Sequence, residues 1–336
     1  MLSKIRLRPA QALALGVLSY ILIGTILISL PFSQKVPINF IDNLFTITSA
    51  VSTTGLVTVS TYDSYTWFGQ FVLVMMFQIG GWGFMTITSF FFLVIKKDLS
   101  PNRINILKTS YTLPNGFNIK QFILNTVIFT VIIEVIGTLL LWIFFAQANV
   151  DNALWFAFFH TVSAFATAGF GLNNNNLTDF SLNIPVNIVI SVLCYLGAIG
   201  FIVIQDFYLS LRKKRKITFT SKVILIITLV VYILGVIAFY FAEPTIQDKS
   251  FIDKFILSSF QVMTASTTAG FNTMDFGLLA RSVLFIIIII MIIGASPSGT
   301  GGGIKTTSIS ALSGIVMSIL KKKENITFFG NEIPLQ

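Results

Sequence analysis

The chain has 336 residues, of which 54% are hydrophobic and only 10% are charged, whereas a soluble domain is typically about a quarter charged. One cysteine, Cys194, and one histidine, His160, exclude a disulfide framework and argue against a zinc or haem centre. No nucleophile and base lie at a plausible catalytic spacing. The composition therefore predicts neither an enzyme nor a covalently bound cofactor.

The apolar residues gather in long blocks at 12–30, 68–95, 122–145, 186–204, 223–241 and 283–293. Most of these blocks reach the roughly 20 residues needed to cross a bilayer core of about 30 Å. We therefore expect an all-α, multi-pass protein of the cell membrane, surrounded by lipid. No small-residue cleavage pattern follows the first block, so we interpret it as a retained span and not as a signal peptide.

Most of the 22 lysines and arginines fall in four places, at 4–8, 96–120, 212–222 and 321–323. The positive-inside rule puts these segments, and with them the N-terminus, in the cytoplasm. Short basic runs at the ends of spans do not indicate nucleic-acid binding, and we predict no nucleic-acid partner. Acids outnumber bases on the opposite side, which would concentrate cations there. Ordinary solvation of loops explains the same excess.

Three segments of the chain align with one another, at 46–56, 160–170 and 261–271. Each is a short apolar stretch that begins after an acid (Asp42, Asp151 or Asp253) and ends in a Thr/Gly turn, and a further apolar block follows. The alignment predicts three span–pore helix–span repeats at 1–108, 109–216 and 217–320, with a cytoplasmic segment at 321–336.

The short stretch in each repeat predicts a re-entrant pore helix. About a dozen residues give about 18 Å of helix, which reaches only the middle of the membrane. We expect the acid at the helix start to accept free backbone N–H groups there. Irregular backbone at that depth must line a polar cavity or be buried in protein, and its carbonyls can replace the hydration shell of a cation.

We therefore predict an ion filter built by the three turns. Its residues are Thr53, Thr54, Gly55, Thr167, Ala168, Gly169, Thr268, Ala269 and Gly270. Close packing between helices is the alternative for one such run, but it explains three runs in register less well.

The second span of the third repeat is interrupted. Residues 282–293 are strongly apolar, but 294–307 contain five glycines and a proline, which cannot continue a stable helix. A discontinuous span is typical of transport proteins. We predict a gate beneath the filter, formed by Gly294, Ser296, Gly299, Gly301, Gly302, Gly303 and Lys305.

The sequence allows more than one role for two charged residues near the predicted pore. Lys305 either places positive charge on the cation path, or fixes the loop to a carboxylate, or extends to the cytoplasmic edge. Ile304 separates Lys305 from the glycines, so the run departs from the nucleotide-binding pattern. Glu134 lies inside an apolar span, where we expect a polar contact between helices rather than ion coordination.

These motifs resemble those of the Trk/Ktr/HKT superfamily of K⁺ transporters, and most closely the membrane subunit of bacterial Ktr systems. The matching motifs are Ile-Asp-Asn-Leu-Phe at 41–45, Thr-Thr-Gly-Leu at 53–56, Gln-Ile-Gly-Gly-Trp-Gly-Phe-Met at 78–85, Ser-Ala-Phe-Ala-Thr-Ala-Gly-Phe at 163–170, Thr-Thr-Ala-Gly-Phe-Asn at 267–272 and Ser-Gly-Thr-Gly-Gly-Gly-Ile-Lys at 298–305.

The resemblance implies a pore of four units with pseudo-fourfold symmetry and one glycine per filter quarter. It implies K⁺ as the transported ion, bound at the filter carbonyls, with Na⁺ as a stimulating ion in a symport. It also implies a homodimer and a cytoplasmic, nucleotide-binding regulatory subunit of the RCK type. Glycine at 55, 169 and 270 is the form that accepts K⁺.

The sequence departs from this pattern in one respect, because only three repeats are visible. The spacing predicts the next filter glycine about 100–115 residues after Gly270, and the chain does not reach that far. We expect an incomplete ring, whose last quarter belongs to a longer gene product or comes from elsewhere. A Na⁺ or ammonium transporter on the same scaffold, or a non-conducting truncated homologue, stays open as an alternative.

Overall fold

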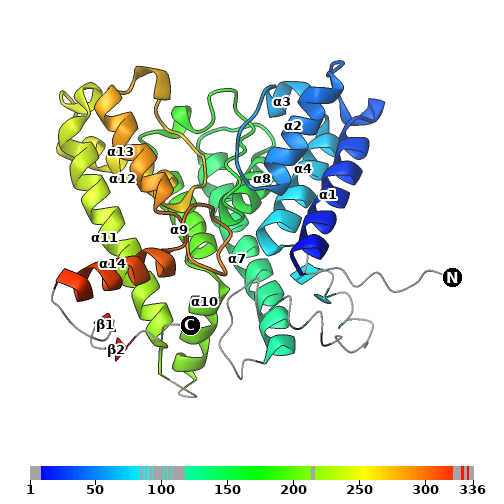
Figure 1. Ribbon diagram of the computed structural model, residues 1–336. Helices are drawn as coiled ribbons and strands as arrows, with labels where there is room; N and C mark the ends of the chain where they lie inside the picture. Colours follow the sequence, from blue (N-terminus) through cyan, green and yellow to red (C-terminus); the bar gives the residue numbers. More distant parts are fainter. Residues whose placement is uncertain are drawn as a thin grey trace.

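The computed structural model describes residues 9–83, 86–87, 89–90, 93, 101, 104, 107, 118–212, 216–320, 327–328 and 331–332. Within this part of the chain the fold is helical, apart from a short antiparallel ladder that pairs β1 (Thr327–Phe328) with β2 (Asn331–Glu332). Helices from the start of the chain lie on one side of the molecule and those from its end on the other, with the middle of the chain between them (Figure 1).

The helices follow one another in three stretches of similar order. The first holds α1 (Pro9–Ile28), α2 (Phe40–Val51), α3 (Thr61–Ser64) and α4 (Trp67–Trp82). The second holds α7 (Ile119–Gln147), α8 (Ala153–Phe165), α9 (Ile184–Ile199) and α10 (Phe201–Leu211). The third holds α11 (Phe219–Ala242), α12 (Phe251–Thr267), α13 (Arg281–Ile292) and α14 (Thr306–Leu320). Short 3-10 helices occur at Pro31–Ser33, Thr178–Phe180, Pro244–Ile246 and Phe276–Leu278.

Among the described residues, two helices are long and apolar enough by themselves to cross a membrane, namely α7 with 29 residues and α11 with 24. The pair α9 and α10 passes the same criteria jointly but bends by 94° between its two parts. The apolar block at 186–204, which the sequence analysis expected to cross the bilayer, is therefore bent and not straight. Gly200 breaks the helix at φ +88°, and a side chain there would overlap Ser296 Oγ.

Three short helices, α2, α8 and α12, each end in one of the Thr/Gly turns. α2 has 12 residues, α8 has 13 and α12 has 17, so the shortest spans about 18 Å. The expectation that acids cap these helices is wrong. Ser250 Oγ caps α12 by accepting the N–H of Asp253, and α8 begins after Asp151.

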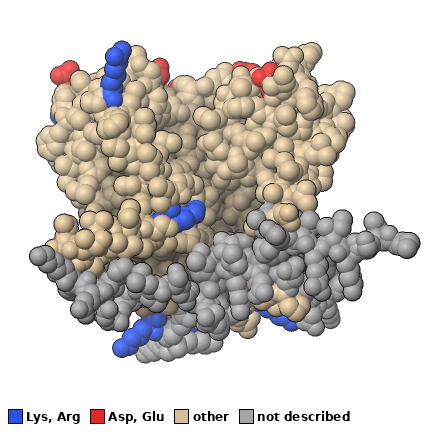
Figure 2. All heavy atoms as spheres, viewed as in Figure 1, with Lys and Arg blue, Asp and Glu red and all other residues tan. Residues whose placement is uncertain are grey.

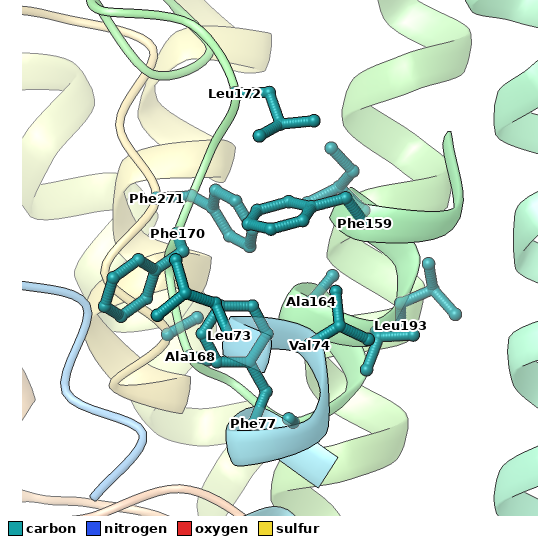
Figure 3. Close-up of a cluster of buried hydrophobic side chains, with 14 of the residues drawn as sticks. Leu73, Val74, Phe77, Phe159, Ala164, Ala168, Phe170, Leu172, Leu193 and Phe271 are labelled. Atoms are coloured by element: carbon teal, nitrogen blue, oxygen red, sulfur yellow. The ribbon is translucent and has the colours of Figure 1, made fainter. Parts of the chain in front are cut away.

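A cluster of buried apolar side chains packs behind the second of these turns (Figure 3). Phe77 of α4 and Phe170 of the turn lie with their ring centroids 4.9 Å apart. Leu73 from α4, Phe159 from α8 and Leu193 from α9 belong to the same cluster. Side chains from three helices, α4, α8 and α9, therefore pack together with this turn.

Candidate functional site

The three Thr/Gly turns share one backbone conformation. Thr53, Thr167 and Thr268 each adopt a left-handed conformation, with φ of 51°, 52° and 55°. In each turn this threonine N–H bonds to the carbonyl three residues back, and the next N–H bonds to the carbonyl five residues back. This is the Schellman pattern that ends a helix. β-Branched residues rarely adopt the left-handed region, so its recurrence at three threonines is informative.

The threonine hydroxyls repeat the same contact. Thr53, Thr167 and Thr268 each donate from Oγ1 to the carbonyl of the preceding residue, over 2.8, 2.7 and 2.7 Å. A helix end leaves several carbonyls without a partner, and each hydroxyl satisfies one of them locally. The remaining carbonyls of the turn stay available for another partner.

The glycines two residues further on meet one another. A side chain on Gly55 would lie 2.8 Å from Ala168 O, one on Gly169 would overlap Ala269 O, and one on Gly270 would lie 3.3 Å from Thr54 O. Each glycine thus faces the carbonyl that precedes the glycine of another turn. All nine residues that the sequence predicted as a filter therefore gather at one point, and only glycine leaves room for that approach.

The loop at 294–305 lies against these turns and touches each of the three left-handed threonines. Thr53 Oγ1 lies 3.4 Å from Thr300 O, and Thr167 Oγ1 lies 3.0 Å from Thr300 Oγ1. Gly302 N donates to Thr268 Oγ1 over 2.6 Å. The loop predicted as a gate is thus hydrogen-bonded to all three turns.

The same loop also holds the break between α9 and α10. Ser298 accepts the first N–H groups of α10, from Phe201 N at its carbonyl (3.2 Å) and from Ile202 N at its Oγ (3.1 Å). Ser296 Oγ donates to Ile199 O over 2.5 Å. The free N–H groups that the bend at Gly200 creates are therefore capped by a loop nearly 100 residues away in sequence.

Lys305 supports the shape of the loop itself. Its Nζ donates to Gly301 O over 2.8 Å, and the ammonium is partly buried. Gly294 N donates to Ile304 O (3.1 Å) and Ala295 N to Gly302 O (2.9 Å), so the two ends of the loop lie side by side. Lys305 thus fixes the loop, as one of the interpretations of the sequence expected, but its partner is a backbone carbonyl and not a carboxylate.

Glu134 and His160 do not belong to the three turns, but His160 lies beside the second one, because a side chain on Gly171 would lie 3.3 Å from His160 Nε2. Glu134, in the middle of α7, hydrogen-bonds Gln78 of α4. His160 is fully buried in α8, with Nδ1 2.8 Å from Phe156 O and its ring between phenylalanines that include Phe156 and Phe271. Both residues lie where their helices pack against other parts of the protein.

Sequence reasoning missed an asparagine run at 173–176 that joins the loops above the turns. Asn174 Nδ2 donates to Asp63 Oδ2 over 2.7 Å, and Asn176 Nδ2 donates to Gly169 O over 3.1 Å. A cavity of about 750 Å³ opens there, and its walls include all three turn glycines. Four consecutive asparagines between two apolar blocks are the sequence signal that could have drawn attention to this run.

A buried carboxylate was missed as well. Asp206 of α10 accepts hydrogen bonds from Thr218 N (3.2 Å), from Thr218 Oγ1 and from Ser221 Oγ (2.6 Å). These groups begin α11, so Asp206 ties the bent part of the second stretch to the first helix of the third.

Residues 14–331 match the family model described as "TrkH: Cation transport protein". The chain belongs to the TrkH family of cation transport proteins. It is 34% identical to the "Potassium/sodium uptake protein NtpJ" of Enterococcus hirae over 98% of this chain and 74% of that protein. It is 33% identical to the "Ktr system potassium uptake protein B" of Bacillus subtilis over 96% of this chain and 74% of that protein.

The fold of this TrkH family member is also similar to a solved structure. The crystal structure of the potassium transporter TrkH from Vibrio parahaemolyticus superposes with a TM-score of 0.70 at 20% identity, over 98% of this chain and 68% of that one. At that identity the likeness concerns the fold alone. Membership of the family makes the chain a membrane protein for cation transport and not an enzyme.

Proposed function

We propose that this chain is the pore-forming membrane subunit of a potassium uptake system. The proposal rests on three turns that have the same backbone conformation and lie close together. The glycine of each turn faces a backbone carbonyl of another turn. Backbone carbonyls that gather in this way replace the hydration shell of K⁺ in known filters. The two curated relatives with potassium uptake in their names support K⁺ as the ion.

The loop at 294–305 is the gate of this pathway in our proposal. It bonds to the threonine of every turn, and a loop so placed closes the passage on that side. Lys305 holds the loop in its compact form through Gly301 O. Opening requires the loop to give up its bonds to the three threonines, each of which contributes only about 1 kcal/mol net.

The proposed orientation puts the loops above the filter outside the cell and the N-terminus in the cytoplasm. Acidic side chains gather along the upper edge of the molecule, whereas basic side chains lie both there and in its lower part (Figure 2). Asp63, Asp179 and Asp275 belong to the upper loops, whereas Arg212 and Lys216 flank the lower turn between α10 and α11. This distribution agrees with the positive-inside rule.

The ring is open on one side, and we propose that a fourth span–pore–span unit completes it. Thr54, Gly270 and Gly302 are exposed, whereas Thr167 and Ala168 are buried. Exposed irregular backbone cannot face hydrocarbon, so protein or a water-filled cavity must cover it. The further expectations of a homodimer, an RCK-type regulatory subunit and stimulation by Na⁺ also belong to this proposal.

A second candidate function is uptake of Na⁺ on the same scaffold, because one relative is named for both potassium and sodium. Uptake of labelled Rb⁺ by a strain that lacks its own K⁺ uptake separates the candidates. We expect the chain, alone or with a fourth unit supplied, to take up Rb⁺ in competition with K⁺ but not with Na⁺. Absence of uptake in both arms, with the protein present in the membrane, contradicts the proposal.

A further inference from the structure

Asn176 connects the second turn to the loop that follows the third. Its Nδ2 donates to Gly169 O over 3.1 Å, and its Oδ1 accepts from Asn272 N at 3.4 Å. Leu177 N donates to Asn272 O over 3.1 Å, so the backbone closes the same link. Asn176 is left-handed, with φ of 57°, a conformation that asparagine adopts more readily than most residues.

This contact distinguishes one filter glycine from the other two. Within the part of the chain that the structure describes, a side-chain amide bonds to the carbonyl of Gly169, but no such bond is found for Gly55 or Gly270. A carbonyl oxygen has two lone pairs, so Gly169 O can accept from Asn176 and still face an ion. Its direction, however, is no longer free.

The direction of a carbonyl matters because glycine lets the peptide plane rotate. Gly169 has φ of 71°, and it has no side chain to oppose rotation of the following peptide. The preference of a filter for K⁺ over Na⁺ depends on the number and field strength of its carbonyls and on how closely they can approach the ion. A carbonyl held by an amide cannot follow a smaller ion inward.

We infer that Asn176 is a positioning residue that sets the preference of this pore for K⁺ over Na⁺. The inference rests on the proposed function, because it requires the turns to bind the transported ion. It goes beyond that function by assigning selectivity to a residue outside the Thr/Gly turns. Asn176 acts through Gly169 O and need not touch the ion.

A neighbouring asparagine supplies a matched control. Asn174 also bridges two loops, since its Nδ2 donates to Asp63 Oδ2 and its Oδ1 accepts from Ser60 Oγ. It makes no contact with a turn carbonyl in the described residues. If Asn176 merely held the loops together, loss of Asn174 should have a similar effect.

Two variants separate the two bonds of Asn176. Asn176→Gly removes both bonds and keeps the left-handed backbone without strain. Asn176→Asp is isosteric and keeps the acceptor for Asn272 N, but as a carboxylate it cannot donate to Gly169 O. If the glycine variant does not fold, the aspartate variant by itself decides the question.

The experiment measures Rb⁺ uptake by the full chain in proteoliposomes, together with the fourth unit if the unaltered chain needs it for uptake, with K⁺ or Na⁺ as the competitor. We expect the ratio of K⁺ to Na⁺ potency to fall roughly tenfold in both variants, the size of one hydrogen bond, and to stay unchanged in Asn174→Ala. An unchanged ratio in Asn176→Asp, or an equal fall in Asn174→Ala, overturns the inference. If K⁺ does not inhibit Rb⁺ uptake by the unaltered chain, the proposed function is contradicted instead.

Discussion

The second and the first Thr/Gly turns have the same backbone but very different surroundings. The residue after the glycine is Phe170 in the second turn, with 1% of its surface exposed, and Leu56 in the first, with 60% exposed. Phe170 lies in the aromatic cluster of Figure 3, and Asn176 holds the glycine before it. Local hydrogen bonds therefore set the shape of both turns, whereas packing supports only one of them.

The two turns should therefore differ in how well they tolerate substitution. A turn packed in a dense core has few alternative positions, because shifts there open cavities or cause overlap. In the first turn Thr54 and Leu56 are exposed, and the hydrogen bond to the loop found among the described residues comes from Thr53. Four predictions test this difference, from the largest expected effect to the smallest.

The largest effect is expected from alanine at the three glycines. All three share a positive φ, whose cost for alanine is about 1–2 kcal/mol, so differences among them report on crowding. Gly169→Ala should abolish folding or uptake, Gly55→Ala should impair it, and Gly270→Ala should be the mildest, following the space at each site. Yield of monodisperse protein and Rb⁺ uptake provide the measurements. A series in which Gly270→Ala is the worst contradicts this ranking.

Truncation of the residue after the glycine compares the two turns directly. Phe170→Ala should destabilise the protein by about 3 kcal/mol, because it leaves a cavity in a closed core. Leu56→Ala removes an exposed side chain and should change stability little. Thermal unfolding in one detergent measures both. Similar losses in the two variants would show that the first turn is packed as firmly as the second.

The contact between the loop and the turns should respond to loss of one hydroxyl. Thr300→Val keeps the shape of the side chain but removes the bonds of Oγ1 to Phe165 O and Thr167. If the loop closes the pore, uptake at low external K⁺ should rise by roughly fivefold, which corresponds to about 1 kcal/mol. Thr300→Ser retains the hydroxyl and serves as the control. Reduced uptake in the valine variant contradicts a closing role.

The smallest effect is expected at the starts of the short helices. Ser250 caps α12 with its hydroxyl, whereas Asn39 makes no side-chain cap at the start of α2. Ser250→Ala should cost about 1 kcal/mol, and Asn39→Ala should cost less. Thermal unfolding again reports the difference. Equal losses of stability at both positions would mean that the hydroxyl cap of Ser250 does not stabilise α12.

Much of the candidate site could be read from local sequence. The Thr-x-Gly pattern occurs three times after a short apolar stretch and predicted that each stretch ends in a turn, although the left-handed conformation of Thr53, Thr167 and Thr268 was not foreseen. The glycines and proline at 294–303 likewise predicted the interruption between α13 and α14. In both cases the signal depends on neighbours along the chain.

Other features depend on contacts that are distant in sequence, and sequence reasoning missed them. The bend at Gly200 requires Ser296 and Ser298 from the loop, because Ser298 accepts the N–H of Ile202 and Ser296 donates to the carbonyl of Ile199. Asp206, which the sequence did not single out, is a buried carboxylate that accepts hydrogen bonds from Thr218 and Ser221 at the start of α11. The asparagines at 174 and 176 gain their partners from the other two stretches.

By itself, then, the sequence determined membrane residence, the family and the positions of three turns, because hydropathy, motifs and helix-ending signals act over short distances along the chain. The tertiary structure decided which carbonyls face one another, which turn is supported by a core and what holds the loop at 294–305. The physical reason is that a carbonyl's direction and a side chain's burial are set by atoms that only folding brings together.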